Sequence, residues 1–353
     1  MIVIDGSFGE GGGQILRTAV SLSALTMKPI RITNIRAGRP KPGLKKQHIA
    51  GIELTGRLVD ATIRGLDLGS TTIEFIPNER RSGTFSYDVG TAGSISLVLQ
   101  AVLPPAILSS EPIVLNLRGG TDVKWSPPID YLSNVFTDTM KGMGATIRIN
   151  QKRRGHYPRG GGMVSCEIVP TSEIEPLEVV KFGKLKNVSG ISHCVRLPGH
   201  IAERQASSAE NVIEDQLNIQ ADIVRESYPK GDDPHLGPGS GIVIWAEDDC
   251  GNRLGSDMLG ERGISAESVG SNAATHLVGE VSSEMAIDSH LCDMLIPYLA
   301  IASGTSKIGI TTITSHLTTN IWATEHILGT QFNLQSNVDK SGILTIVGAG
   351  LSL

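Results

Sequence analysis

The sequence predicts an α/β fold built from three βαβαββ units, with a smaller α/β domain inserted ahead of the third. Three observations support this prediction. Apolar segments of strand and helix length recur three times in one order. The 353 residues exceed a single typical core. A stretch with a different order of elements separates the second unit from the third, which indicates an insertion.

The first unit begins at the N-terminus. Its short strands alternate apolar and polar residues, and its two helices carry apolar residues at helical spacing. Strands are expected at 1–5, 29–37, 61–65 and 71–77, and helices at 14–26 and 44–60.

The second and third units repeat this plan. For the second unit we expect strands at 84–89, 112–119, 145–150 and 162–170 and helices at 92–108 and 129–144. For the third we expect a helix at 285–304, a strand at 307–313, a loop at 314–320, a helix at 321–328 and two closing strands. The predicted domains are therefore 1–184 for the first two units, 185–280 for the insert and 281–353 for the third unit.

Three loops hold the same place in the three units, between the second strand and the second helix. They are 36–43, 118–128 and 314–320. Ligands gather at such loops because helix N-termini present free N–H groups there. If the three units pack around one centre, these loops converge. His316 of the third loop is then expected in a cleft, whereas an isolated loop histidine is usually a solvated surface residue.

A glycine loop at 9–13 joins the first strand to the first helix. It lacks the G-x-G-x-x-G spacing of dinucleotide folds and the Lys-Ser/Thr of a P-loop. Glu10, beside three glycines, is placed to hold a divalent cation over a polyphosphate. Arg17, one turn into the helix, is expected to meet a phosphate from the same side. The alternative is a loop that merely turns the chain.

A basic, proline-containing stretch follows at 36–48. Prolines stiffen this loop, and fixed arginines such as Arg36 and Arg39 suit phosphate binding better than mobile ones. A solvated charged surface is the alternative.

Asp293 lies on a largely apolar helix and needs a partner, for which a histidine ring N–H is one candidate. The basic turn 156–162 is interpreted as a hairpin connection.

The remaining polar residues favour no further site. Five histidines show no metal-ligand spacing, and the four scattered cysteines support neither a zinc site nor a disulfide framework. The histidines are His193, His200, His235, His276 and His326. The net charge of −5 argues against a protein that coats nucleic acid, and 4% aromatic residues argue against a plain RNA-binding module.

Two features bear on location. No window approaches 18 continuous apolar residues, so no transmembrane helix and no membrane partner are predicted. The N-terminal stretch lacks the pattern of an export signal, so we expect a cytoplasmic protein. Self-association is possible, but no interface is legible in the sequence.

Taken together, several motifs make the chain resemble the RNA 3′-terminal phosphate cyclase family. They extend in order from residue 5 to residue 320, and they are DGSFGEGGGQILR, RAGRPKPGLKKQH, GTAGSISLVLQ, GGTDVKWSPP, HYPRGGG and SHLTTN. The resemblance implies three repeats like the C-terminal domain of a bacterial translation initiation factor, with a smaller domain inserted before or within the third.

The resemblance also implies an activity, the ATP-dependent conversion of an RNA 3′-phosphate to a 2′,3′-cyclic phosphate. By this analogy His316 attacks the α-phosphorus of ATP and carries AMP to the RNA, with Mg²⁺ or Mn²⁺ facing Glu10. RNA with a 3′-phosphate end and ATP are the implied partners. Residues resembling the ATP-contacting elements are Glu10, Gln100, His290, Leu291, Cys292, Asp293 and Met294. Residues resembling the phosphate-pocket lining are Arg17, Arg36, Arg39, Gln47 and His48.

Two alternatives share the fold. A non-catalytic cyclase-like ribosome-biogenesis factor lacks the histidine nucleophile, so the intact SHLTTN segment and Glu10 argue against it. An enolpyruvyl-transferase-like enzyme needs lysine and arginine clusters for its substrates, but not the EGGGQ loop or this histidine.

Overall fold

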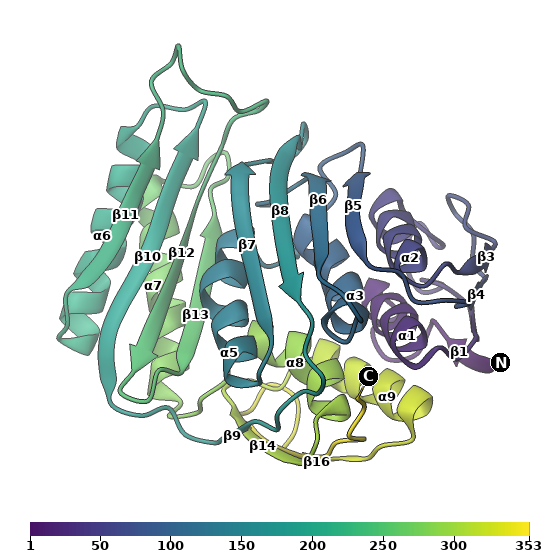
Figure 1. The fold of residues 1–353 in the computed structure, drawn as a ribbon. Coiled ribbons are helices and arrows are strands. Elements are labelled where there is room, and N and C mark those ends of the chain that lie inside the picture. The colour runs from purple at the N-terminus through teal and green to yellow at the C-terminus, as the bar shows by residue number, and fades with distance from the viewer. Residues whose placement is uncertain (353) are drawn as a thin grey trace.

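The computed structural model describes residues 1–352 and confirms the predicted α/β class. Its strands form four four-stranded mixed sheets, and helices pack against each sheet (Figure 1). Three of the sheets share one strand order. In each of these, the first two strands pair in parallel and the remaining two join antiparallel.

The first two repeats follow one another along the chain. The first contains β1 (Ile2–Asp5), α1 (Gly13–Thr26), β2 (Ile30–Thr33), α2 (Lys46–Leu58), β3 (Thr62–Arg64) and β4 (Ile73–Ile76). The second contains β5 (Gly83–Asp88), α3 (Ile95–Ile107), β6 (Ile113–Gly119), α4 (Ile129–Tyr131), η1 (Leu132–Phe136), α5 (Thr137–Gly142), β7 (Thr146–Arg153) and β8 (Gly162–Val169). The last helix of the second repeat is thus one run, α4 to α5, widened by a π-type turn.

The third repeat is interrupted by the insert. Its first strand, β9 (Glu178–Val179), precedes the insert and pairs in parallel with β14. The other elements follow the insert: α8 (Ser289–Ile301), β14 (Thr305–Ile310), α9 (Ser315–Leu328), β15 (Phe332–Gln335) and β16 (Gly342–Val347). The insertion therefore lies between the first strand and the first helix of the repeat, so the third sheet takes one strand from the 1–184 segment.

The insert has its own sheet and its own core. It contains β10 (Leu185–Val195), α6 (His200–Leu217), β11 (Ala221–Ser227), β12 (Gly239–Asp248), β13 (Arg253–Leu259) and α7 (Ala266–Ser282). Its strand order is β11-β10-β12-β13, and α6 and α7 pack together over the sheet. A separate hydrophobic cluster, which includes Ile213, Ile244 and Leu277, fills the space between them.

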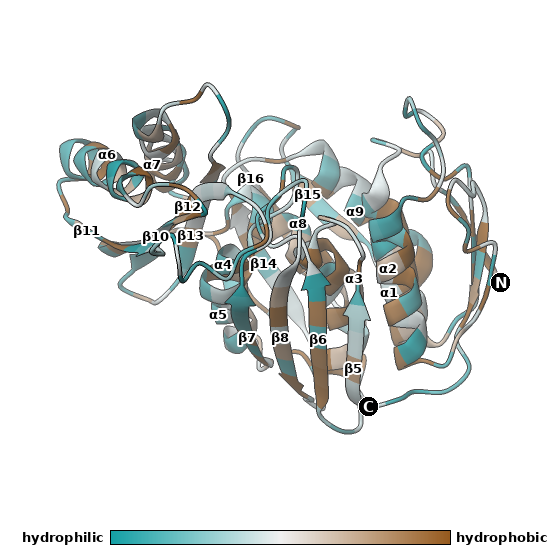
Figure 2. Cartoon of the chain, turned by 90° about the horizontal axis from the view of Figure 1, so that it is seen from above, coloured by the Kyte–Doolittle hydropathy of each residue, from teal (hydrophilic) through white to brown (hydrophobic). Residues whose placement is uncertain are grey.

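The helices of the three repeats meet at the centre of the molecule. Helix α1 packs on α3 and α9, and α8 packs on α3 and α9. One hydrophobic core spans all three repeats. The strands of the repeats alternate buried and exposed residues, so each sheet turns one apolar face inward. Figure 2 shows hydrophobic residues along β6, β8 and α3, in contrast to the largely hydrophilic α6.

Further sequence expectations can be compared with the structure. The turn 156–162 joins β7 to β8, which pair antiparallel, so the hairpin interpretation is confirmed. The four cysteines are free thiols. Among residues 1–352, no helix is long and apolar enough to cross a membrane.

Candidate active site

The candidate active site lies where the first turns of α1, α2 and α9 come together. Glu10, in the loop before α1, lies against His316 in the first turn of α9. His48, in the first turn of α2, lies over Gly13 at the start of α1. Helix N-termini carry unpaired N–H groups and partial positive charge, so their convergence favours a bound anion.

His316 belongs to a helix and not to a loop. Helix α9 begins at Ser315, so the expected loop at 314–320 is wrong beyond its first residue. Thr314 is the reason, because its hydroxyl accepts the backbone N–H of Leu317 at 2.9 Å and caps the helix. The imidazole therefore projects from a rigid first turn, with about half of the side chain exposed.

Glu10 is the nearest charged group to the His316 ring. Its Oε2 lies 2.7 Å from His316 Nδ1, and its Oε1 lies 3.3 Å from the Arg39 guanidinium. Burial lowers the pKa of His316, and the charges of Arg17 and Arg39 lower it further, against the opposing effect of Glu10. The neutral imidazole is therefore the main form at neutral pH.

The glycine loop is held against α9 by close packing. Gly9 has φ +57°, and a Cβ there would collide with the Thr319 hydroxyl. The Glu10 backbone N–H also points to that hydroxyl, at 3.4 Å. These contacts fix the loop over the helix that carries His316, which explains why Glu10 reaches the imidazole.

Arg17 and His48 form the floor of the site. A Cβ on Gly13 would lie 2.6 Å from His48 Nε2 and 3.0 Å from Arg17 Nη1, so glycine is required where these side chains cross. Burial lowers the pKa of Arg17 to about 10, although Asp293 and Glu10 oppose the shift. Arg17 thus remains charged at neutral pH.

His48, in contrast to Arg17, is neutral. Burial, followed by the charges of Arg17, Arg36 and Lys45, lowers its pKa to about 3, so the ring stays neutral. Its Nδ1 accepts the Lys45 backbone N–H at 3.1 Å, which leaves the proton on Nε2. That N–H faces the start of α1, where it can donate to an anion.

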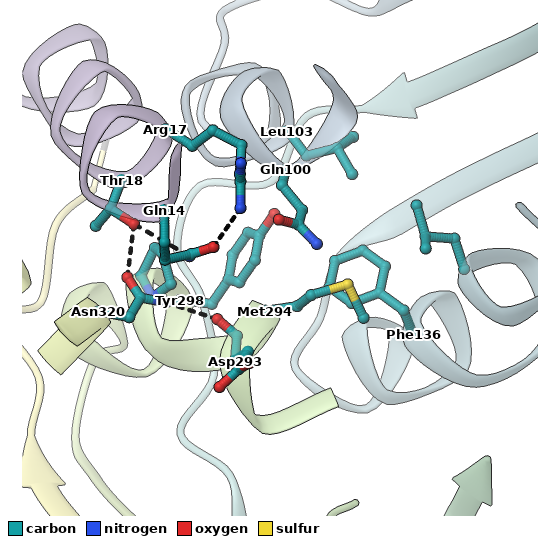
Figure 3. Close-up of a pocket in the computed structure, with 12 residues that line it drawn as sticks. Gln14, Arg17, Thr18, Gln100, Leu103, Phe136, Asp293, Met294, Tyr298 and Asn320 are labelled. Atoms are coloured by element: carbon teal, nitrogen blue, oxygen red, sulfur yellow. Dashed lines mark hydrogen bonds between the residues drawn. The ribbon is translucent and has the colours of Figure 1, made fainter. Parts of the chain in front are cut away.

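Arg17 borders two adjoining cavities. The first lies among α1, α3, α8 and α9, and is shown in Figure 3. Its lining residues include Gln14, Gln100, Asp293, Met294 and Tyr298. The second lies between α1, α2 and α3, with Gln47 and His48 in its wall. Both cavities are small, and the Arg17 side chain lies in the wall of each.

A buried chain of hydrogen bonds joins the helices around this pocket. The Thr18 hydroxyl donates to Asn320 Oδ1 at 2.6 Å, and Asn320 Nδ2 donates to the Asp293 carbonyl at 2.6 Å (Figure 3). Gln14 Oε1 accepts from Arg17 at 2.5 Å. These hydrogen bonds fix α1, α9 and α8 relative to one another and orient the Arg17 guanidinium.

Asp293 has a different partner from the one expected. Its Oδ1 accepts the Thr314 hydroxyl at 3.0 Å, while the carboxylate nearest to the His316 ring belongs to Glu10. The candidate role of Asp293 as the partner of a histidine N–H is therefore wrong for His316. Asp293 acts on the histidine through the N-cap residue of α9.

Other predicted residues lie outside the pocket. Leu291 and Cys292 are fully buried in the shared hydrophobic core. His290 faces the insert, where its Nε2 lies 3.6 Å from Asp257. Arg36 donates to the carbonyls of Lys41 and Gly43 at 2.7 and 3.0 Å. Arg36 thus shapes the basic loop, while Arg39 reaches Glu10.

Two of the three loops meet at the site. The 36–43 loop contributes Arg39, and the 314–320 segment contributes His316. In the 118–128 loop, Asp122 and Lys124 instead contact side chains of the adjacent hairpin and the insert. The 118–128 loop thus contacts the insert and contributes none of these side chains to the active site.

Sequence reasoning missed the residues that hold the site together. They are Gln14, Thr18, Thr314 and Asn320. Gln14 and Asn320 lie within quoted motifs, and a polar residue on an otherwise apolar helix face was the available signal. Thr18 and Thr314 form pairs across distant helices, which local pattern does not predict.

Comparison with known proteins identifies the family of the chain. A family model described as RNA 3′-terminal phosphate cyclase matches residues 8–334. A protein named RNA 3′-terminal phosphate cyclase from Methanopyrus kandleri is 54% identical over 93% of each chain. Its namesakes from Staphylothermus marinus and Ignicoccus hospitalis are 48% and 47% identical over at least 99% of each chain. The chain belongs to the RNA 3′-terminal phosphate cyclase family.

Proposed function

We propose that the protein is an ATP-dependent RNA 3′-terminal phosphate cyclase that works through a histidine–AMP intermediate. The observation that carries this proposal is the position of His316. A neutral imidazole projects from a helix N-terminus, beside a carboxylate and near the partly buried Arg17. This arrangement is suited to attack on a phosphorus atom.

The ring has one nitrogen free for attack. Nδ1 faces Glu10 at 2.7 Å, so Nε2 is the nitrogen directed away from the carboxylate. Attack of Nε2 on the α-phosphorus of ATP forms an N–P bond and breaks the bond to pyrophosphate. The lowered pKa of His316 keeps the lone pair available at neutral pH.

The pocket supplies the groups that the triphosphate requires. Arg17 is charged and partly buried, and its buried Nε lacks a hydrogen-bond partner among residues 1–352. His48 adds a neutral N–H donor at the N-terminus of α1. Such preorganised donors stabilise charge on the equatorial oxygens of a transferring phosphoryl group. Met294 and Tyr298 add apolar surface to the adjoining cavity, on the side away from the helix N-termini.

A divalent cation fits the carboxylate of Glu10. Its Oε2 is shielded from solvent and receives no well-directed hydrogen bond among residues 1–352, although His316 is close. Carboxylate oxygen is a preferred ligand of Mg²⁺ and Mn²⁺. When bound, the ion would neutralise phosphate charge. Glu10 would hold it, and Arg39 would orient the second oxygen of the carboxylate.

The remaining steps use the RNA itself. A 3′-phosphate oxygen attacks the histidine-bound AMP, the N–P bond breaks and an adenylated RNA end forms. The neighbouring 2′-hydroxyl then attacks the terminal phosphorus, and AMP leaves as the cyclic phosphate closes. Adenylation thus converts an unreactive phosphate into one with a good leaving group.

Substitution of His316 tests the nucleophile. With ATP labelled at the α-phosphate, the wild-type protein should acquire an acid-labile, alkali-stable label. His316→Ala should reduce labelling by on the order of 10³-fold or more. His326→Ala, on the exposed side of the same helix, is the matched control and should label normally. Full labelling of the His316 variant would assign the intermediate to another residue.

The RNA substrate requires a separate measurement. A short RNA with a 3′-phosphate should be cyclised, while the same RNA with a 3′-hydroxyl should not be consumed. A protein that neither labels nor cyclises, but binds ribosomal precursors, would instead be the non-catalytic alternative.

Glu10→Gln tests the cation. The variant keeps the size of the side chain but loses its charge, so self-adenylylation should fall on the order of 100-fold. The dependence on Mg²⁺ or Mn²⁺ concentration should shift upward, and circular dichroism should show an unchanged fold. An unaltered metal dependence would remove Glu10 from the cation site.

A further inference from the structure

Two motifs that the active site does not use meet at the joint between the insert and the second repeat. Asp122 belongs to the 118–128 loop, and His156 belongs to the basic turn between β7 and β8. His193 comes from β10 of the insert. All three side chains are buried, with 2%, 7% and 1% exposure, respectively. We propose that they form a metal site, separate from the active site, for a tetrahedral divalent cation of the zinc type.

The ligand atoms already face one another. Nε2 of His193 lies 3.2 Å from Nε2 of His156. Two nitrogens bound to one Zn²⁺ at about 2.0–2.1 Å in tetrahedral geometry lie about 3.3 Å apart. The Asp122 oxygens lie 3.8 Å from His193 Nε2 and 4.0 Å from His156 Nε2. A shift of well under 1 Å brings the three ligand atoms to zinc distances.

The charges around the cluster favour a cation. Arg154 is buried and contacts three carboxylates, those of Asp122, Asp130 and Glu226. The Arg154 guanidinium therefore balances one of the three negative charges. The neutral imidazoles of His156 and His193 contribute no positive charge. A divalent ion would neutralise the excess in a place where unpaired charge is costly.

The protonation states are those that a metal requires. Burial and the nearby Arg154 lower the pKa of His193, so the ring is neutral with a lone pair available. Burial also lowers the pKa of His156. Burial raises the pKa of Asp122, but His193, Arg154, His156 and the Thr121 hydroxyl together lower it below its ordinary value. Metal ligands must be deprotonated, and these directions are compatible with that requirement.

His193 can carry on Nε2 the lone pair that binds a metal ion. Its Nδ1 is buried and has no hydrogen-bond partner among residues 1–352, so no neighbour fixes the tautomer. Without a metal, the 3.2 Å contact between the two Nε2 atoms is a hydrogen bond that uses a single proton. A cation would accept both lone pairs at once.

A cavity gives access to the site. Asp122 and His156 line a cavity of about 790 Å³ between the second repeat and the insert. Three protein ligands leave one tetrahedral position, which a water molecule from this cavity would fill. Two imidazoles and one carboxylate favour zinc-type ions over Mg²⁺, which prefers oxygen ligands. The inference is thus independent of the cyclase reaction and its cation.

The consequence is a cross-link between domains. Two ligands come from the second repeat and one from the insert, so a bound ion would hold β10 against the β7–β8 hairpin. Because a ligand that binds the folded state stabilises it, the ion should raise the temperature at which the two parts separate.

Co²⁺, a spectroscopic substitute for Zn²⁺, tests the site. The full chain carrying His316→Ala is used, so that the active-site imidazole cannot compete. After treatment with a chelator, it should bind one Co²⁺ with the intense visible absorption of a tetrahedral complex. Adding His193→Gln or His156→Asn should weaken binding at least about 100-fold, since even outer-shell partners contribute 10–100-fold. His276→Gln, at an exposed histidine of the insert, should leave binding unchanged.

Two results would overturn the proposal. One is a Co²⁺ spectrum that survives His193→Gln and His156→Asn. The other is a parent protein that binds no Co²⁺. Should either variant fold poorly, a crystal of the wild-type protein soaked in Zn²⁺ decides the matter. The proposal expects an anomalous peak among the three side chains, and a map without that peak refutes it.

Discussion

At the scale of single residues, the site depends on groups whose charge is set by burial. Arg17 remains charged although it is partly buried, and His48 and His316 remain neutral. Asp293 differs, because burial raises its pKa to about 7, against the opposing effects of the Thr314 hydroxyl, His290 and Arg17. The Asp293 side chain therefore changes charge within the physiological range.

This shift makes stability depend on pH. The carboxyl has a pKa of about 3.9 in the unfolded chain, so the folded state holds a proton that the unfolded state releases. The stabilisation is fully present below about pH 4 and is lost as the pH rises through about 7. Asp293→Asn lacks this dependence and still accepts a hydrogen bond from Thr314.

The advantage of Asp293→Asn over wild type should therefore grow between pH 4 and pH 7 and level off above it. Its upper limit is about 4 kcal/mol in the free energy of unfolding. Urea titrations at pH 5 and pH 8 measure the difference, with the exposed Asp232→Asn as control. An equal difference at both pH values would show that Asp293 has an ordinary pKa.

At the scale of single residues, the sequence predicted which residues belong to the site better than it predicted which side chains contact one another. Glu10, Arg17 and His316 stood out by type and by neighbouring glycines. The carboxylate that contacts the His316 imidazole could not be identified in this way. The choice between Glu10 and Asp293 depends on how the glycine loop packs over α9. Long-range contacts of that kind leave no periodic signal.

At the scale of elements, the N-cap of α9 positions the nucleophile. The Thr314 hydroxyl accepts from Leu317 N–H and donates to Asp293, so it joins the start of α9 to α8. Thr314→Ala removes both bonds. It should cost about 1 kcal/mol of stability and lower the rate of self-adenylylation by about tenfold to a hundredfold through misplacement of His316.

Thr314→Ser is the matched variant for this prediction. Serine keeps the hydroxyl, so labelling at saturating ATP should return to near the wild-type rate. Comparison of the maximal rate with the ATP concentration at half-maximal rate separates positioning from binding. A loss confined to ATP affinity, or a serine variant as slow as the alanine variant, would contradict a positioning role.

Element boundaries show where sequence pattern is weakest. Helices α1 and α3 were predicted within a few residues because their apolar periodicity is long. The two-residue β9 was missed, because a strand of that length has no period. Strand β13 also has a weak sequence signal, since its Gly255, Ser256 and Asp257 interrupt the apolar pattern.

At the scale of the whole molecule, Asp288 joins three structural units. It lies almost fully buried before α8 of the third repeat. Its Oδ1 accepts the Tyr131 hydroxyl of the second repeat at 2.6 Å and the Leu291 N–H of α8 at 3.0 Å. Its Oδ2 accepts the Gly255 N–H of the insert at 2.8 Å. No local sequence pattern indicates this junction, because its partners are far apart along the chain.

The two oxygens allow the insert to be uncoupled selectively. Asp288→Asn can keep its carbonyl oxygen toward Tyr131 and Leu291, but then turns an NH₂ group toward the Gly255 N–H. Two donors facing each other in a buried position should cost about 1–3 kcal/mol. Asp288→Ala loses all three bonds and should cost more, including about 1 kcal/mol for the helix cap.

Hydrogen exchange can locate these losses. In Asp288→Asn, faster exchange should be confined to β13 and the neighbouring strand β12, because the link to the insert is the one that breaks. In Asp288→Ala, α8 and the α4 segment around Tyr131 should also exchange faster. The exposed Asp339→Asn should match wild type throughout. If Asp288→Asn instead accelerated exchange equally in all four sheets, the insert would unfold together with the repeats, and Asp288 would not be a separable joint between them.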